Sequence, residues 1–301
     1  MEMELFCLPQ ARVMQRECNG NPRPEVVGCG TDPAKSSADS LFNGRLICYQ
    51  PRCGYRFSVD AVLLAHFVKP RQGWRVLDLG SGCGIIALIL AYRFPDCSLV
   101  AVENQPIPAA LARRNVGANG FTARIQVLAE DVRRLRSVLS PESFDCVLCN
   151  PPYFNQGRGR LSREEQAAMA RHDLSGKLTD FIRAAAFAVK NRGRVAFIFP
   201  ASSQARLQQE LLAFRLTPKR LQVVYSYPAA RNAALVLVEA MKNGGEGCAV
   251  MPPMYLYDQP GGSYSPALQA MYQENQDEQG EGQANPEEDR KNLEERCWPQ
   301  S

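Results

Sequence analysis

The tetrapeptide Asn150-Pro151-Pro152-Tyr153 follows a short apolar run, residues 144–149, that is typical of a buried strand. An Asn at a strand end can present its side-chain oxygen, and the neighbouring Pro151 has a carbonyl but no backbone N–H. Two such acceptors suit a planar NH2 group, and Tyr153 offers an aromatic face for a base or an amide. We therefore predict that Asn150, Pro151 and Tyr153 are catalytic.

A glycine-rich loop lies upstream, between a predicted strand over residues 74–79 and a predicted helix that begins near Gly84. Glycines at 80, 82 and 84 allow positive φ angles and a close approach of the backbone to a ligand, and the first N–H groups of the helix face the same loop. A second predicted strand, residues 98–103, ends on Glu103, 21 residues beyond Gly82. A carboxylate at that spacing suits hydrogen bonds to ribose hydroxyls.

A dinucleotide-binding loop requires a third glycine at position 85, where this chain has Ile85. With Asp78 ahead of the first glycine, the loop instead resembles the first motif of class I S-adenosylmethionine (SAM)-dependent methyltransferases. That resemblance implies SAM as cofactor, Glu103 at its ribose and Asp131 at its adenine amino group. The predicted cofactor-binding residues are Asp78, Gly80, Ser81, Gly82, Gly84, Glu103 and Asp131. A tight turn in an α/β domain of another use is the alternative.

Strands and helices alternate along the chain, which predicts an α/β fold with a mostly parallel sheet. We expect a seven-stranded class I SAM-methyltransferase (Rossmann-like) sheet with helices on both faces, and its last two strands, 220–225 and 234–240, antiparallel. A small N-terminal hairpin is expected to pair residues 45–49 with 55–57.

Composition shifts predict the domain boundaries. Residues 1–40 are expected to be a disordered N-terminal extension, 41–258 the methyltransferase domain, and 259–301 a C-terminal segment with an acidic disordered tail. From Glu274 onward the chain carries nine acidic and three basic residues, so the formal net charge of +4 leaves +10 on residues 1–273. A basic body favours a polyanionic partner such as RNA.

The chain of 301 residues is 45% apolar, enough for a full core, yet its longest apolar run, residues 85–92, is far shorter than the ~20 residues that span a bilayer. With no signal-peptide pattern at the N-terminus, we expect a cytoplasmic protein without membrane attachment. Eleven scattered cysteines predict reduced thiols. Cys146 and Cys149 have the spacing of a metal pair, but their place in a buried strand favours core packing, and no metal is predicted.

From Leu41 to Tyr272 the chain resembles bacterial methyltransferases related to the family that N6-methylates adenosine 37 of a valine tRNA. The resemblance rests on residues 54–65, the glycine loop, 150–154, 170–173 and 218–221. It implies N6-methylation of an adenine in RNA, with tRNA as the partner. Basic residues expected to contact the RNA are Arg158, Arg160, Arg171, Lys219 and Arg220. The two terminal extensions and Asp173, where Glu is expected, depart from the family pattern.

Several alternatives share the Asn-Pro-Pro-Tyr chemistry. A protein glutamine N5-methyltransferase and an rRNA guanine N2-methyltransferase also act on a planar nitrogen. A SAM-fold protein that binds RNA without catalysis is a further alternative, against which the intact Asp78, Glu103 and Asn150 argue. A DNA methyltransferase is disfavoured because no second region large enough to read a duplex remains outside the expected fold.

Overall fold

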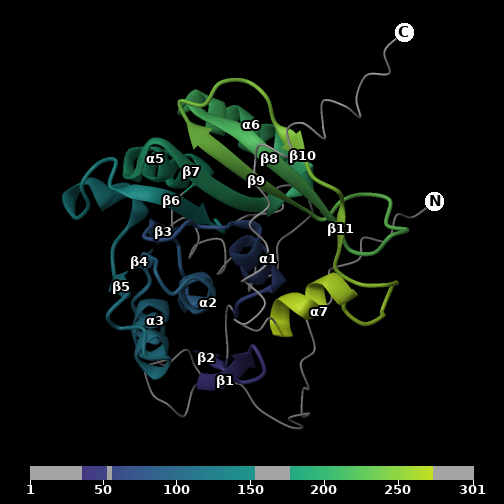
Figure 1. Ribbon diagram of the computed structural model, residues 1–301, viewed down its shortest axis with the longest axis horizontal. Helices are drawn as coiled ribbons and strands as arrows, with labels where there is room; N and C mark the ends of the chain where they lie inside the picture. The colour runs from purple at the N-terminus through teal and green to yellow at the C-terminus, as the bar shows by residue number, and fades with distance from the viewer. Residues whose placement is uncertain (1–35, 53–55, 153–176, 274–301) are drawn as a thin grey trace, which may run out of the picture.

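Short apolar segments of the chain pair into one twisted, mostly parallel sheet that lies between two layers of helices (Figure 1). The computed structural model describes residues 36–52, 56–152 and 177–273. The sheet order is β10-β8-β9-β7-β6-β3-β4-β5, and β11 also pairs with β8. The strands are β3 (Arg75–Leu79), β4 (Ser98–Val102), β5 (Ile125–Leu128), β6 (Phe144–Cys149), β7 (Val189–Pro200), β8 (Leu216–Tyr225), β9 (Leu235–Lys242), β10 (Ala249–Val250) and β11 (Met254–Tyr255).

Seven of these strands are the predicted class I sheet. Strand β9 is antiparallel to β8, as expected, and it is also antiparallel to β7. The two further strands, β10 and β11, are two residues long and parallel to β8. Two residues are too few to show an alternation of apolar and polar side chains, so these strands could not be predicted from the sequence.

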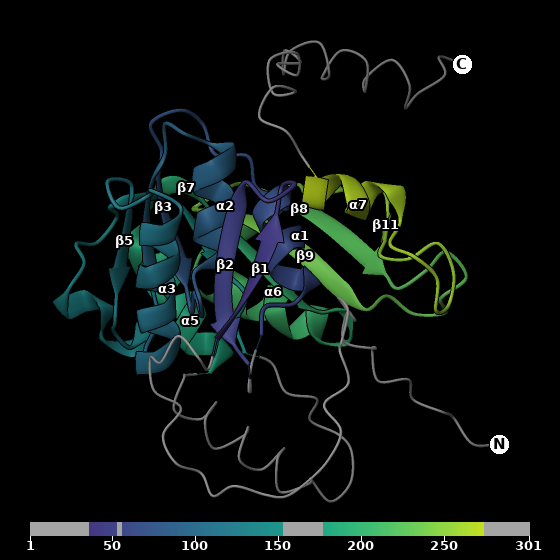
Figure 2. The same cartoon turned by 90° about the horizontal axis from the view of Figure 1, so that it is seen from below.

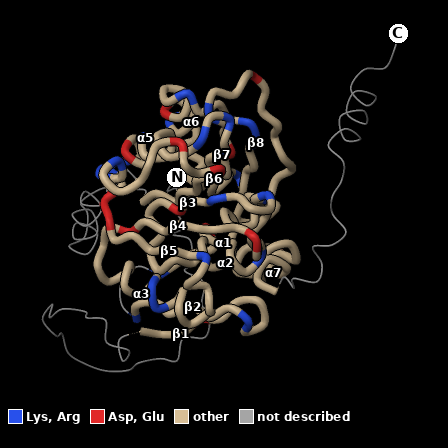
Figure 3. Tube along the Cα trace, turned by 60° about the vertical axis from the view of Figure 1, so that its left-hand side comes forward, with Lys and Arg blue, Asp and Glu red and all other residues tan. Residues whose placement is uncertain are grey.

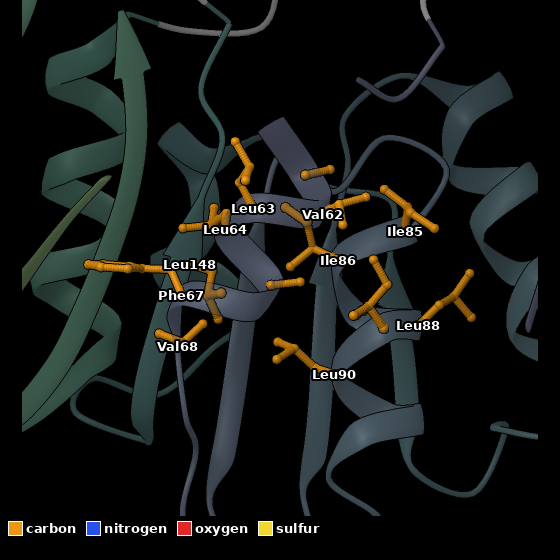
Figure 4. Close-up of a cluster of buried hydrophobic side chains, with 14 of the residues drawn as sticks. Val62, Leu63, Leu64, Phe67, Val68, Ile85, Ile86, Leu88, Leu90 and Leu148 are labelled. Carbon is orange, nitrogen blue, oxygen red and sulfur yellow. The ribbon is translucent and has the colours of Figure 1, made fainter. Parts of the chain in front are cut away.

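The helices cover both faces of the sheet (Figures 1 and 2). One face carries α1 (Val59–Phe67), α2 (Ile85–Arg93) and α3 (Pro106–Ala118), and the other carries η2 (Val132–Ser137), α5 (Leu178–Ala188) and α6 (Gln204–Ala213), with η3 (Ala201–Ser203) just ahead of α6. Each face has its own apolar core. In the first core, side chains of α1 and α2 lie next to one another, and Leu148 of β6 lies beside Leu64 and Phe67 of α1 (Figure 4).

The N-terminal hairpin differs from the expected one. Strand β1 (Ser36–Leu41) pairs with β2 (Leu46–Pro51), whereas residues 56–58 form no strand and 53–55 lie outside the described residues. Residues 36–40, expected outside the fold, are therefore part of a strand. The sequence Ser-Ser-Ala-Asp-Ser-Leu lacks an apolar alternation, and backbone pairing with β2 holds it in place.

The described fold also continues past residue 258. Helix α7 (Pro266–Gln273) packs against α1, and its Leu268 is fully buried in the first core. The N–H of Phe42 donates to the carbonyl of Tyr272 at 2.8 Å, which joins the hairpin turn to the end of α7. Within the described residues, no helix is both long and apolar enough to cross a membrane.

Candidate active site

The carboxyl ends of three neighbouring parallel strands meet at one edge of the sheet. Leu79 of β3 is level with Val102 of β4 and with Cys149 of β6. The next residue on each strand is therefore at this edge: Gly80, Glu103 and Asn150. Residues that are distant in the sequence are thus brought together by strand register alone, as predicted for a ligand site of a parallel sheet.

The glycine loop is tied to the adjacent strand by backbone hydrogen bonds. The N–H groups of Gly80 and Ser81 both donate to the carbonyl of Val102, at 2.9 and 3.0 Å. Gly82 has a φ of +56°, and an added Cβ would meet no described protein atom within 4 Å. A side chain at Gly82 would therefore point away from the described protein, which fits a backbone that a ligand approaches.

The other two glycines have packing roles. An added Cβ at Gly80 would lie 3.1 Å from the ring of Phe181 on α5, and one at Gly84 would lie 3.2 Å from Cβ of Ala112 on α3. Gly84, at φ +85°, is the residue from which α2 starts, and it lets α2 and α3 pack closely. This packing contact helps to set the position of the loop.

Asp78 is a buried carboxylate at the end of β3. It is 1% exposed; no side chain is paired with it among the described residues, and the backbone N–H of Ala87 is near it without a well-formed hydrogen bond. Burial raises the pKa of Asp78 from 3.8 to about 7, against the backbone N–H of Ala87 near the start of α2, which lowers it; the nearby Glu103 adds a smaller increase. The hydroxyl of Ser81 is likewise buried without a described partner. Buried polar atoms of this kind are completed by water, an ion or a ligand group.

Glu103 links β4 to the glycine loop. Its Oε2 accepts from the N–H of Gly82 at 2.9 Å and its Oε1 accepts from the N–H of Gln105 at 2.8 Å. Burial raises the pKa of the Glu103 carboxyl, while these backbone hydrogen bonds lower it. Each carboxylate oxygen keeps further acceptor capacity, so Glu103 can hold the loop and still accept from a ligand hydroxyl.

Asp131 precedes η2 and is already engaged by Arg133. Its Oδ1 accepts from the Arg133 N–H at 2.8 Å, and the two side chains form an ion pair. Hydrogen bonds from Arg133 lower the pKa of the Asp131 carboxyl. Asp131 is thereby ionised and held at the start of η2, three residues after the end of β5.

The tetrapeptide that the sequence predicts to be catalytic is described only in part. Asn150 is half-buried and Pro151 is buried directly after β6, whereas Tyr153 lies outside the described residues. The same holds for Arg158, Arg160 and Arg171, three of the five residues predicted to contact RNA.

Lys219 and Arg220 are described, and both are engaged within the fold. Lys219 Nζ donates to backbone carbonyls of the 245–247 loop. Arg220 donates to the carbonyl of Phe67 at 2.5 Å and to Glu239 at 3.1 Å, and its guanidinium stacks on the Phe67 ring. Both side chains therefore stabilise the fold first, and a direct RNA contact by either would have to share these bonds.

Asn115 of α3 is a supporting residue that the sequence prediction missed. It is fully buried; its Nδ2 donates to the carbonyl of Cys83 in the glycine loop at 2.9 Å, and its Oδ1 accepts from the N–H of Tyr49 in β2 at 2.7 Å. A single amide thus joins the loop to the hairpin. An Asn on the apolar face of a predicted helix was the available signal, because a buried amide needs partners.

Cys146 and Cys149 pack into different cores on opposite faces of the sheet. Residues three apart in a strand point to opposite sides, so this pair cannot chelate one ion. Within the described part of the chain, no group of three or more His, Cys, Asp or Glu side chains is placed to hold a metal.

Comparison with known proteins identifies the family. Residues 58–200 match the family model of the methyltransferase small domain. The tRNA1(Val) (adenine(37)-N6)-methyltransferase of Porphyromonas gingivalis is 33% identical over 185 residues, which are 60% of this chain and 72% of that protein. The enzyme of the same name from Bacteroides thetaiotaomicron is 28% identical over 201 residues, 66% of this chain and 82% of that protein.

Among solved structures, a predicted O-methyltransferase from Agrobacterium tumefaciens superposes with a TM-score of 0.58 at 25% identity, covering 71% of this chain and 95% of the other. The SAM-type glycine loop, the sheet topology and these relatives agree. The chain belongs to the family of the tRNA1(Val) (adenine(37)-N6)-methyltransferases and is a SAM-dependent methyltransferase.

Proposed function

We propose that the protein methylates the N6 nitrogen of an adenine in a tRNA, with adenosine 37 of the anticodon loop as the specific target. The observation that carries the proposal is the convergence of Asn150 with the glycine loop at one sheet edge, in a chain whose relatives are named for this reaction. The fit of the cofactor is supported by Asp78, a buried carboxylate without a described partner.

We assign the cofactor contacts as follows. Asp78 and Ser81 complete their hydrogen bonding with the charged amino acid end of SAM, because an orphaned carboxylate stabilises a cation. Glu103 accepts from the ribose hydroxyls, and Asp131 accepts from the adenine amino group. Gly82 leaves its backbone accessible to the ligand. When bound, SAM would supply an electrophilic methyl group. The sulfonium that carries this methyl group would become a neutral thioether, the leaving group.

The chain's contribution to the methyl transfer is orientation. The N6 lone pair of adenine is delocalised into the ring, so the nitrogen is planar and weakly nucleophilic. Oδ1 of Asn150 and the carbonyl of Pro151 accept hydrogen bonds from its two N–H groups, which directs the lone pair toward the methyl group, while Tyr153 stacks on the ring. N6 gains the methyl group and then gives one proton to water, so no strong general base is needed.

An adenine in an RNA loop requires less free energy to enter the site than one inside an RNA helix, because it need not be unpaired first. The basic body of the chain favours RNA over the glutamine side chain of a protein as substrate.

The test is a substrate screen. The purified full chain is incubated with labelled SAM and, separately, with tRNA, rRNA, DNA and protein from a cell that lacks the enzyme, and the product is identified by mass spectrometry. N6-methyladenosine at position 37 of a tRNA is the expected product. N5-methylglutamine or N2-methylguanosine would replace the proposal with one of its alternatives, and absence of methyl transfer to every substrate would leave a binding protein.

A further inference from the structure

A basic hollow of about 450 Å³ lies at the edge of the sheet opposite to the active site. Its walls come from the segment before β3, the first residues of β6 and β7, and the middle of β8 and β9. Asp145, on its wall, and Asn150, at the active site, are five residues apart on β6, a distance of about 17 Å. The hollow is therefore a separate surface and not an extension of the cofactor site.

The charge of this hollow is unbalanced. Two carboxylates, Asp145 and Glu239, face six basic side chains: Lys69, Arg71, Lys190, Arg192, Arg194 and Arg220. Asp145 pairs with Lys190 at 2.6 Å, and Glu239 lies between Arg194 at 3.3 Å and Arg220 at 3.1 Å. These pairs offset two of the six positive charges, so an excess of four remains.

The excess is concentrated on the rim. Lys69, Arg71 and Arg192 are exposed, and none of them forms an ion pair with a described residue, although Arg192 donates one hydrogen bond to the carbonyl of Asn243 at 3.3 Å. Arg71 lies over the half-buried ring of Trp74, 6.0 Å from its centre. Unpaired cations beside an aromatic face suit a phosphate followed by a ribose or a base. Lys and Arg are also frequent around α6, β7 and β8 in Figure 3.

We propose that this hollow binds the phosphate backbone of the substrate RNA, outside the loop that carries the methylated base. The identity of the RNA rests on the proposed function, whereas the basic hollow itself does not. The active-site edge holds one loop nucleotide, and a structured tRNA extends well beyond it. Contacts at the hollow then make the enzyme prefer a whole tRNA over an isolated loop.

The test compares two charge-reversal variants of the full chain. Lys69→Glu/Arg71→Glu alters the rim, and Arg113→Glu/Arg206→Glu makes the same change of net charge at exposed positions of α3 and α6 outside the hollow. Equilibrium binding to intact tRNA and to its anticodon stem-loop is measured by fluorescence anisotropy over a range of salt concentrations.

The rim variant is expected to bind intact tRNA at least tenfold more weakly, with a salt slope reduced by about 2, because each phosphate contact contributes about 0.9. Its affinity for SAM and for the stem-loop should remain at the wild-type value. Equal affinity of the rim and control variants for intact tRNA would overturn the proposal, and so would an equal loss for tRNA and stem-loop.

The two proposals fail separately. Methylation by the wild-type protein tests the reaction, and the difference between rim and control variants tests the hollow. If the wild type methylates the stem-loop and both variants bind tRNA alike, only the hollow proposal is wrong. If no RNA is methylated, a selective loss of RNA affinity in the rim variant still supports the hollow.

Discussion

The two edges of the sheet carry opposite unbalanced charges. At the carboxyl edge, Asp78 and Glu103 are 1% and 5% exposed, and neither forms an ion pair with a described residue. At the amino edge, six basic residues face two carboxylates. Unbalanced charge is costly unless a ligand or solvent compensates it. The acidic edge therefore suits a cation such as SAM, and the basic edge suits phosphate.

The largest expected effect is on the methyl-transfer step at the carboxyl edge. Asn150→Ala removes one of the two acceptors that orient the amine, and we expect the single-turnover rate to fall about 100-fold. Asn150→Asp keeps an acceptor oxygen and should retain measurably more activity. Lys69→Glu/Arg71→Glu should leave this rate unchanged at saturating RNA. Wild-type turnover by the Asn150→Ala variant would remove Asn150 from the mechanism.

The carboxylates of the two edges should respond oppositely to neutralisation. Glu239→Gln removes the partner of two half-buried arginines, so the free energy of unfolding should fall by about 2 kcal/mol. Asp78→Asn removes an unpartnered buried charge, so at pH 8 the protein should become more stable by a similar amount.

Urea unfolding of the SAM-free protein measures both changes, and destabilisation by Asp78→Asn would show that Asp78 has a structural partner.

The pH dependence of stability gives a second check on Asp78. The folded-state pKa of Asp78, about 7, lies above its ordinary 3.8, so the unfolded chain holds fewer protons between these values. The contribution of Asp78 to the free energy of unfolding should therefore fall as the pH rises from about 4 to about 7. The Asp78→Asn variant should lack this pH dependence.

SAM affinity should depend on pH through the same residue. A cation favours the ionised Asp78, so binding releases a proton when the pH is below about 7. We expect the association constant to fall by up to about tenfold per pH unit below pH 7, and the Asp78→Asn variant to bind more weakly with a flat profile. Calorimetry in two buffers of different ionisation enthalpy counts the released protons. No proton release at pH 6 would contradict a contact between Asp78 and a cation.

The smallest expected effects distinguish the role of Gly82 from that of Gly84. Gly84→Ala should lower the melting temperature more than Gly82→Ala, because its Cβ meets Ala112 whereas the Cβ at Gly82 meets no described atom. Gly82→Ala should instead reduce SAM affinity, by about tenfold. Thermal unfolding with and without SAM distinguishes the two changes. A Gly82→Ala protein with normal SAM affinity would place the ligand elsewhere.

The sequence predicted the sheet, its antiparallel last pair and the grouping of Asp78, Glu103 and Asn150, because apolar periodicity sets the strands and register then fixes their ends. It did not predict the first hairpin strand, whose residues are polar and held by backbone pairing. It also did not separate Arg220 from exposed arginines, because Phe67 and Glu239, which hold it, are distant in sequence. The net charge of the hollow was not predictable either, because the residues that line it are neighbours in space and distant in sequence.

The amide of Asn115 has a consequence for the exchange of backbone hydrogens with solvent. It connects the carbonyl of Cys83, beside the ligand-binding backbone, to the N–H of Tyr49 in the hairpin. A cofactor that stiffens the loop also stiffens this connection, so the Tyr49 amide should exchange more slowly in the presence of SAM, although it belongs to a different sheet. Mass-spectrometric detection of that protection would reveal cofactor loading from a peptide outside the glycine loop.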